Sequence, residues 1–317
     1  MNFAKNPIIK NIVLISGLTR SGKALLCPIV SSLNNTEKVN VNFFLEQVPI
    51  LNYLREINNN TSKFLIRSGM NMGVYDNAIG RNSNFRPDDY TSVWKYKEPM
   101  EYVQRLFLPD GDAVLDRLNQ QNRVFPMMVH NGLWHANLWF DALPSLKMIH
   151  MQRSPIEIVF SWMGKGYGGG FYTSGRSNIV TYEYKGKVLP YYAYGWEELY
   201  VSLGDVDRII YMVQHIRECH QKSYESLDVK QKDRVLFVRH RGVSTNPDKH
   251  IPIISDFVGE SPSNRTSDIL LQENCPRVFN SSEFDKKVLE IQQQSSTEAF
   301  DILMGMHHQF ISHDCAI

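Results

Sequence analysis

Glycines and cations share a short segment near the amino terminus. Residues 17–24, GLTRSGKA, fit the phosphate-binding pattern G-x-x-x-x-G-K-[ST] at every position but the last, where Ala24 stands. Backbone N–H groups of such a loop, at the start of a helix, attract an anion, and Arg20 and Lys23 add positive charge. Because the missing hydroxyl is the one that holds magnesium in nucleotide triphosphatases, the segment predicts an anion site without a metal. The alternative is a glycine turn that carries solvated cations.

A second set of residues with binding chemistry begins at Arg153, which follows the apolar stretch 146–152. Ser154 and Glu157 have the spacing of a capping box and predict that a helix starts here. Ser161 would lie on that helix. An Arg at the carboxyl end of a parallel strand can bind a phosphate through two nitrogens, and Ser161 can add a hydroxyl. The alternative for Arg153 is a salt bridge at the start of the helix.

The elements that must position these residues alternate along the chain. An apolar run predicts a strand before residues 17–24, and apolar positions at helical spacing predict a helix after them. We expect strands over 8–15, 39–45, 146–152 and 235–238, helices over 22–34, 205–226 and 283–294, and a hairpin over 181–194. Residues 52–130 are polar and irregular, with one helix near 112–122.

This alternation predicts an α/β fold with a central, mostly parallel sheet flanked by helices. We expect residues 1–317 to form a single domain, with insertions over about 50–130 and 164–200. The second insertion is rich in Gly and aromatic residues, and either a mobile lid or a hairpin packed on the body fits that composition.

Composition narrows the class of protein. The chain has 34 Lys and Arg against 33 Asp and Glu, a formal charge of +1, so no broad field favours nucleic acid or a membrane surface. It holds no apolar run of about 18 residues that would span a bilayer, and its first residues do not resemble a signal peptide. The 4 cysteines are dispersed without a CxxC pair, so neither a disulfide framework nor a zinc site is indicated. We expect a cytoplasmic protein without a metal.

The two sets of residues together resemble the sulfotransferase family that uses 3′-phosphoadenylyl sulfate. That family has a 5′-phosphosulfate loop of the form [KR]-S-G-T-T, and the corresponding positions here, preceded by Thr19, are Arg20, Ser21, Gly22, Lys23 and Ala24. Its 3′-phosphate motif, R-x-P-x-x-x-x-x-S, is matched by Arg153, Pro155 and Ser161. Residues 235–259 follow, more weakly, the family's pattern of strand, Pro turn and helix ending in Phe-x-Gly.

The resemblance implies a P-loop-containing, nucleotide-binding fold and a metal-independent transfer of a sulfuryl group from 3′-phosphoadenylyl sulfate to a hydroxyl or amine. The acceptor would be a small molecule or a glycan, with no nucleic-acid partner and no membrane anchor. Arg20 would stabilise the charge of the migrating group. Glu46 is the first candidate for the base, because it ends the expected second strand at the edge that carries the loop. His130 and His135 are the alternatives, since imidazole is the commonest base.

Some positions depart from the family. Lys23 and Ala24 replace two threonines, and residues 240–242, HRG, replace the usual Tyr-Glu-Asp. Arg265 and Arg277 are the candidates for the basic residues that complete the 3′-phosphate site. Two other functions therefore remain open: a P-loop kinase acting on a small molecule, and a catalytically silent nucleotide-binding protein on the same scaffold.

Overall fold

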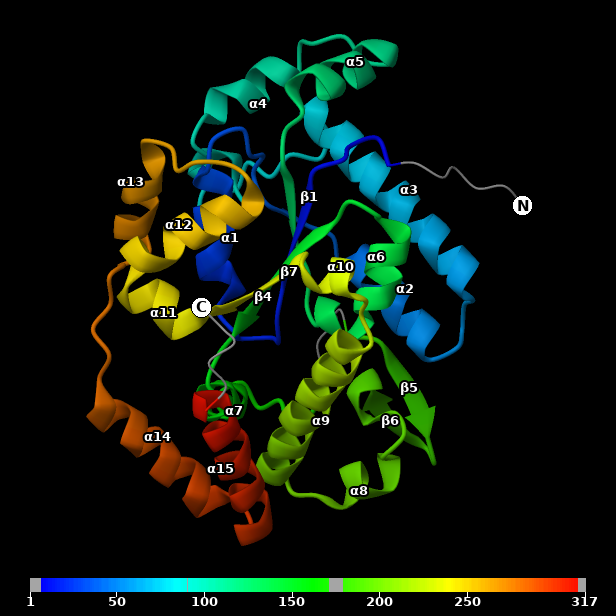
Figure 1. Cartoon of the computed structure of the whole chain (residues 1–317). Helices are drawn as coiled ribbons and strands as arrows, with labels where there is room; N and C mark the ends of the chain where they lie inside the picture. Colours follow the sequence, from blue (N-terminus) through cyan, green and yellow to red (C-terminus); the bar gives the residue numbers. More distant parts are fainter. Residues whose placement is uncertain (1–6, 90, 171–178, 313–317) are drawn as a thin grey trace.

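The central element of the fold is a parallel sheet, and the anion site is predicted at the carboxyl ends of its strands. Within residues 7–89, 91–170 and 179–312, which a computed structural model describes, this sheet has five strands in the order β2-β3-β1-β4-β7 (Figure 1). They are β1 Ile12–Ser16, β2 Asn40–Val41, β3 Phe125–Met128, β4 Lys147–Gln152 and β7 Val235–Arg239. Every neighbouring pair is parallel. The predicted α/β class with a mostly parallel sheet is confirmed.

Helices bury both faces of the sheet, as parallel strands require. Leu14 of β1 packs into a core shared with α3 and α6, whereas Val13 and Ile15 pack into a core shared with α1 and α12. The covering helices are α1 Lys23–Ser32, α2 Phe43–Tyr53, α3 Asn59–Ala78, α6 Ala136–Ala142, α12 Pro247–Val258 and α13 Arg265–Gln272.

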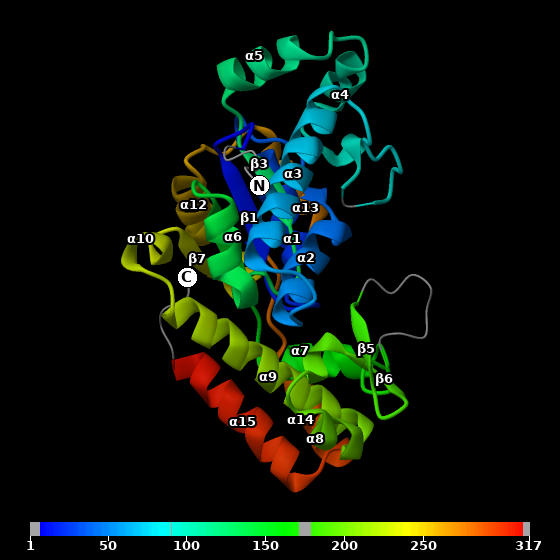
Figure 2. The ribbon, with the colours of Figure 1, turned by 90° about the vertical axis from the view of Figure 1, so that its right-hand side faces the viewer.

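The two ends of the sheet carry different helices. Figures 1 and 2 show α4 Pro99–Arg105 and α5 Asp112–Gln121 grouped at one end of the molecule. At the other end, where the strands finish, α7 Pro155–Met163, α9 Asp205–Glu225, α14 Ser281–Gln294 and α15 Thr297–Ser312 pack on one another. The shorter helices are α8 Glu197–Ser202, α10 Val229–Lys232 and α11 His240–Thr245, with 3-10 turns at Val93–Lys95, Gly132–His135 and Tyr191–Ala193.

The expected second strand over 39–45 is mostly wrong. Only Asn40–Val41 is extended, and α2 begins at Phe43. The reason is the cap: the side chain of Asn42 accepts a hydrogen bond from the backbone N–H of Leu45 at 3.2 Å, which starts a helix in an apolar run that reads equally well as a strand.

For residues 52–130 the sequence predicts an irregular segment with one helix near 112–122. That helix is α5, but the rest of the prediction is wrong. The segment forms the 20-residue helix α3, and it ends in β3, which lies inside the sheet between β2 and β1. Asn58 caps α3 by accepting from the N–H of Thr61 at 3.0 Å. The strand β3 has only 4 residues, including Pro126, which explains why its pattern is not typical of a central strand.

Other local predictions are confirmed. Residues Thr181–Tyr184 (β5) and Lys187–Pro190 (β6) form an antiparallel hairpin, with Lys185 at φ 48° and Gly186 at φ 74° in its turn. The hairpin packs on the body through Leu189. Of the two alternatives for residues 164–200, β5 and β6 therefore match the packed hairpin and not the mobile lid. Residues 171–178 of that stretch lie outside the described part of the chain.

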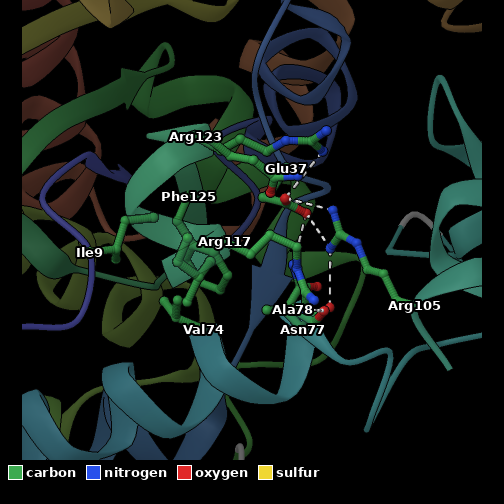
Figure 3. Close-up of a pocket in the computed structure, with 11 residues that line it drawn as sticks. Ile9, Glu37, Val74, Asn77, Ala78, Arg105, Arg117, Arg123 and Phe125 are labelled. Carbon is green, nitrogen blue, oxygen red and sulfur yellow. Dashed lines mark hydrogen bonds and ion pairs between the residues drawn. The ribbon is translucent and has the colours of Figure 1, made fainter. Parts of the chain in front are cut away.

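A buried ion cluster joins α3 and α4 to Glu37, which precedes β2 (Figure 3). The Glu37 carboxylate accepts from Arg105 at 2.8 and 2.9 Å and from Asn77 at 2.8 Å. Arg123 and the hydroxyl of Tyr102 also donate to it. Burial opposes its charge, but Arg105, Tyr102 and Arg123 outweigh burial and lower the pKa of Glu37 to about 2. The cavity beside the cluster is only about 10 Å³, so the cluster stabilises the fold and leaves no space for a ligand.

Candidate functional site at the carboxyl edge of the sheet

The segment 17–24 joins β1 to α1, as predicted, with Lys23 and Ala24 as the first residues of the helix. Its glycines are required by close approaches. Gly17 has φ +153°, and a Cβ there would lie 2.7 Å from the carbonyl oxygen of Met151. Gly22 has φ +99°, and a Cβ there would lie 2.1 Å from Cδ2 of His240. Arg20, which is not a glycine, is held at φ 69°. Such strained backbone, at the start of a helix, is typical of a functional loop.

Lys23 lies inside the loop. Its Nζ donates to the carbonyl oxygens of Gly17 at 2.8 Å and Leu18 at 2.7 Å, and the residue is only 4% exposed. Burial lowers the pKa of Lys23 to about 8, while the charge of Glu46 opposes that shift. The ammonium thus forms the centre of the loop and gives it positive charge from within.

The two predicted binding segments meet. Nε of Arg20 donates to Oγ of Ser161 at 2.9 Å, and a terminal nitrogen of Arg153 donates to the carbonyl oxygen of Arg20 at 3.1 Å. Arg153 also pairs with Glu157 at 3.1 Å, which is the salt bridge offered as the alternative reading. Its Nε is buried, with no hydrogen-bond partner among the described residues. Arg153 therefore makes the ion pair and still faces the loop.

The predicted capping box at the start of α7 is wrong. Ser154 is the N-cap residue but makes no side-chain capping bond, because its Oγ lies 3.3 Å from Nδ1 of His307 on α15. Glu157 binds Arg153 instead of the backbone of the cap. The helix still begins at Pro155. Arg153 therefore lies where the sequence predicts it, although Ser154 and Glu157 make other contacts than predicted.

Glu46 and His130, predicted as alternative bases, form one pair. Oε2 of Glu46 lies 2.9 Å from Nδ1 of His130. Glu46 lies in the first turn of α2 and not at the end of a strand, so that part of its prediction is wrong. Its other oxygen, Oε1, is buried and has no partner among the described residues. A carboxylate bonded to an imidazole in this way can orient it and accept or relay a proton.

The pair lies beside the 17–24 loop. His130 follows β3, and the next residue, Asn131, donates its backbone N–H to the carbonyl oxygen of Gly17 at 3.1 Å. Burial, with the charge of Lys23, lowers the pKa of His130 below 6.5 despite the opposing effect of Glu46. His130 is therefore a neutral imidazole near pH 7, which is the form that can accept a proton.

His135 has a different environment. Its ring stacks on Trp134, with centroids 5.5 Å apart, and meets Tyr53 edge-on at 6.0 Å. Burial lowers the pKa of His135 to about 3. No contact among the described residues joins it to Glu46, so the structure groups His130 and not His135 with the loop.

His240 is a site residue that the sequence reasoning did not select. Its ring lies against Gly22, and burial, followed by the charges of Arg153, Arg277 and Arg241, lowers its pKa to about 4. The sequence carries a signal for this position, because HRG at 240–242 stands where the sulfotransferase family usually has Tyr-Glu-Asp. An imidazole that follows the end of β7 therefore packs on the 17–24 loop.

The two candidate basic residues near the carboxyl terminus lie in different places. The charge of Arg277 acts on His240, and the Arg277 backbone N–H donates to the carbonyl oxygen of Ser244 at 2.6 Å. Arg265 forms an exposed ion pair with Asp268 at 3.2 Å on α13. The structure therefore groups Arg277 with the site and gives Arg265 a surface partner.

The remaining loop residues have separate contacts. The carbonyl oxygen of Thr19 accepts from Nε1 of Trp162 at 3.0 Å, which anchors the loop to α7. Oγ of Ser21 is buried and has no partner within the described part of the chain, so it can bind a ligand oxygen. Ala24 is exposed and offers no hydroxyl. Among the described residues, no group of three or more His, Cys, Asp or Glu is placed to hold a metal, and no helix has the length and apolarity to cross a membrane.

The sheet and its helices define an α/β protein, and the candidate site lies at the carboxyl edge, where open parallel sheets bind ligands. The chain matches no protein-family model and no curated protein. It is similar to solved sulfotransferases. One, from Mycobacterium avium, is 11% identical with a TM-score of 0.46, over 98% of this chain and 78% of that one. The sulfotransferase domain of the Synechococcus PCC 7002 olefin synthase is 13% identical with a TM-score of 0.44, over 98% of both chains. A sulfotransferase from Alicyclobacillus acidocaldarius is 15% identical with a TM-score of 0.41, over 94% of this chain and 100% of that one.

Proposed function

We propose that the chain is a sulfotransferase that moves a sulfuryl group from 3′-phosphoadenylyl sulfate to a hydroxyl or amine of a small molecule or glycan, without a metal. The observation that carries the proposal is the junction of Arg20, Ser161 and Arg153. It brings two cations and a hydroxyl to one loop, next to the Glu46–His130 pair. An anion site beside a proton acceptor is what this transfer needs.

The residues present fit the donor. The N–H groups of the 17–24 loop, the free Oγ of Ser21 and the guanidinium of Arg20 would hold the 5′-phosphosulfate. Arg153 and Ser161 would hold the 3′-phosphate, and the buried Nε of Arg153 is a donor that still needs an acceptor. Lys23 replaces a lost threonine contact with charge supplied from inside the loop.

The donor, when bound, supplies an activated sulfuryl group on a phosphate leaving group. The residues of this chain then have separate tasks. Glu46 fixes the ring of His130, and the pair takes the proton of the acceptor hydroxyl. Arg20 stabilises the negative charge that grows on the oxygen of the leaving phosphate.

Isothermal titration with adenosine 3′,5′-bisphosphate in a magnesium-free buffer tests the donor site. We expect saturable binding, and a loss of about tenfold or more in affinity for Arg153→Ala, because a charged hydrogen-bonding partner is removed. Arg81→Ala is the matched control, since Arg81 pairs with Asp76 on an exposed surface. Absence of binding, or equal affinities for Arg153→Ala and wild type, refutes the proposal.

The two other functions give different results in the same experiment. A kinase would bind ATP more tightly with magnesium than without, although Ala24 lacks the hydroxyl that holds this ion. A silent binding protein would bind the bisphosphate and release no product with any acceptor. Radiolabelled sulfuryl transfer to a panel of phenols, alcohols and sugars separates it from an enzyme.

A further inference from the structure

A large cavity lies at the carboxyl ends of β4 and β7. It has a volume of about 630 Å³ and is lined mainly by residues of β4, β7, α9 and α15. Of the 17–24 loop only Leu18 borders it, and neither Glu46 nor His130 does. Ligand pockets for small molecules typically measure about 300 to 1,000 Å³, so this cavity has the size of a binding site.

One part of the cavity is cationic. Arg217 of α9 and Arg239 of β7 both lie over the ring of Phe310, at 5.9 and 5.0 Å from its centroid, so their charges are close together. Arg239 donates to the Phe310 carbonyl oxygen at 3.0 Å. For Arg217, no ion pair with a carboxylate occurs within the described residues, and burial lowers its pKa to about 10. The acids that border the cavity are exposed, namely Glu218 and Glu225.

A buried polar group also points to a ligand. His220 borders the cavity and is 5% exposed, and its Nε2 has no hydrogen-bond partner within the described part of the chain. Burial holds the pKa of His220 well below its usual value, so the ring is neutral and its nitrogen is a hydrogen-bonding group without a partner. A buried polar atom of this kind is costly unless something in the cavity bonds to it.

Part of the lining is apolar or aromatic. Phe237 comes from β7, Ile158 from α7, Ile302 and Met306 from α15, and Leu133 from the 3-10 turn Gly132–His135. Polar side chains also border the cavity, namely Gln152, Gln214, Gln221 and Gln309. Such walls bind hydrocarbon or aromatic surface, while the arginines fix a charged end.

We propose that this cavity binds an organic anion with an apolar body, whose acidic group lies by Arg217 and Arg239 and whose body lies against Phe237, Ile302 and Met306. Carboxylates, sulfonates and sulfate or phosphate monoesters share this chemistry. Arg153, assigned above to the 3′-phosphate, also lines the cavity, so the cavity borders the proposed donor site, whereas the residues assigned to the phosphosulfate and the base do not line it. The inference does not depend on the proposed sulfuryl transfer, because it assigns the acidic group to Arg217 and Arg239.

A glycine in the wall makes the inference testable. A Cβ added at Gly305 of α15 meets nothing within 4 Å, and the same is true of Gly73 of α3, which lies away from the cavity. Ala and Leu at position 305 therefore fill the cavity in steps without a clash at Cβ. The same changes at position 73 are the matched control. Because Ala favours helices over Gly, Gly305→Ala is expected to fold even if the larger change is not tolerated.

The probe is 8-anilinonaphthalene-1-sulfonate, an aromatic sulfonate whose fluorescence rises on binding. We expect saturable binding to the folded chain, a small loss of affinity for Gly305→Ala and a loss of about tenfold or more for Gly305→Leu, as the space is filled. Gly73→Ala and Gly73→Leu should match wild type. Arg217→Met should lose about tenfold, and the exposed Lys222→Met on the same helix should lose little. Inorganic sulfate should compete only weakly, because it lacks the apolar body.

Circular dichroism and the thermal midpoint show whether each variant is folded. Equal affinities for the position 305 and position 73 series would overturn the proposal, as would the absence of saturable binding to wild type. Displacement of the probe by adenosine 3′,5′-bisphosphate would also overturn it, because the probe would then occupy the donor site. Failure of the bisphosphate to bind at all refutes the proposed function and leaves this result unchanged.

Discussion

The Nε of Arg20 lies 2.9 Å from the Oγ of Ser161, although the two residues are 141 positions apart. Arg20 is held at φ 69°, a conformation that L-residues seldom adopt. Two contacts from the α7 side hold Arg20 in this conformation. One is its bond to Ser161, and the other is the bond from Arg153 to the Arg20 carbonyl oxygen. The loop after β1 and the start of α7 are therefore joined, and the proposed anion site is formed by both.

Ser161→Ala tests that relationship directly. Loss of the hydroxyl frees Arg20 and removes one ligand contact, so affinity for adenosine 3′,5′-bisphosphate should fall about fivefold to tenfold, measured by titration calorimetry. Ser202→Ala, which removes an exposed hydroxyl that donates to the Leu199 carbonyl oxygen, is the control and should bind like wild type. An unchanged affinity in Ser161→Ala would mean that Arg20 needs no partner.

The Glu46–His130 pair predicts a pH profile for the transfer. Since the neutral imidazole accepts the proton and the pKa of His130 is lowered, activity should be flat near pH 7 and fall as the pH drops through a value below 6.5. Glu46→Gln removes the carboxylate that raises this pKa, so the acid limb should move to lower pH while kcat falls about a hundredfold. Donor affinity should stay near that of wild type, and a matching loss of donor binding would contradict the assignment.

Gly22→Ala should damage both stability and binding. The new Cβ meets the His240 ring at 2.1 Å, and φ +99° is unfavourable for alanine. The free energy of unfolding should fall by about 2 kcal/mol, by chemical denaturation, and binding of the bisphosphate should be lost. Adding His240→Ala removes the clash but not the backbone strain, so it should restore stability only in part. Gly73→Ala, in an open helical position, should be neutral or stabilising.

The Glu37 cluster predicts how acid affects stability. Its folded-state pKa of about 2 lies below the usual 4.5, so its contribution is present above pH 4.5 and is lost as the pH falls toward 2. This difference corresponds to about 3 kcal/mol. In urea titrations from pH 5 to pH 2, Glu37→Gln should be destabilised at pH 5 and show a flatter dependence than wild type. The exposed Glu290→Gln should follow the wild-type curve.

Local signals in the sequence determined the elements that carry the binding residues. The β-branched run before Gly17, the glycine loop and the apolar face after it predict β1, the loop and α1, because each depends on neighbours within about ten residues. The same holds for β4, Arg153 and the start of α7. The residue types and spacing of residues 17–24 and of Arg153 with Ser161 predict two phosphate-binding segments, and the structure brings these segments together.

Tertiary structure decided what the local signals leave open. The strand β3 has 4 residues and contains Pro126, and it is a strand because β1 and β2 lie on either side of it. The apolar run that contains Glu46 fits a strand or a helix, and the Asn42 cap with packing against α3 makes it helical. Distant pairings such as Glu46 with His130, and His240 with Gly22, depend on how the sheet orders its strands. A one-dimensional pattern does not contain that order, because contacts between remote segments form only when the whole core packs.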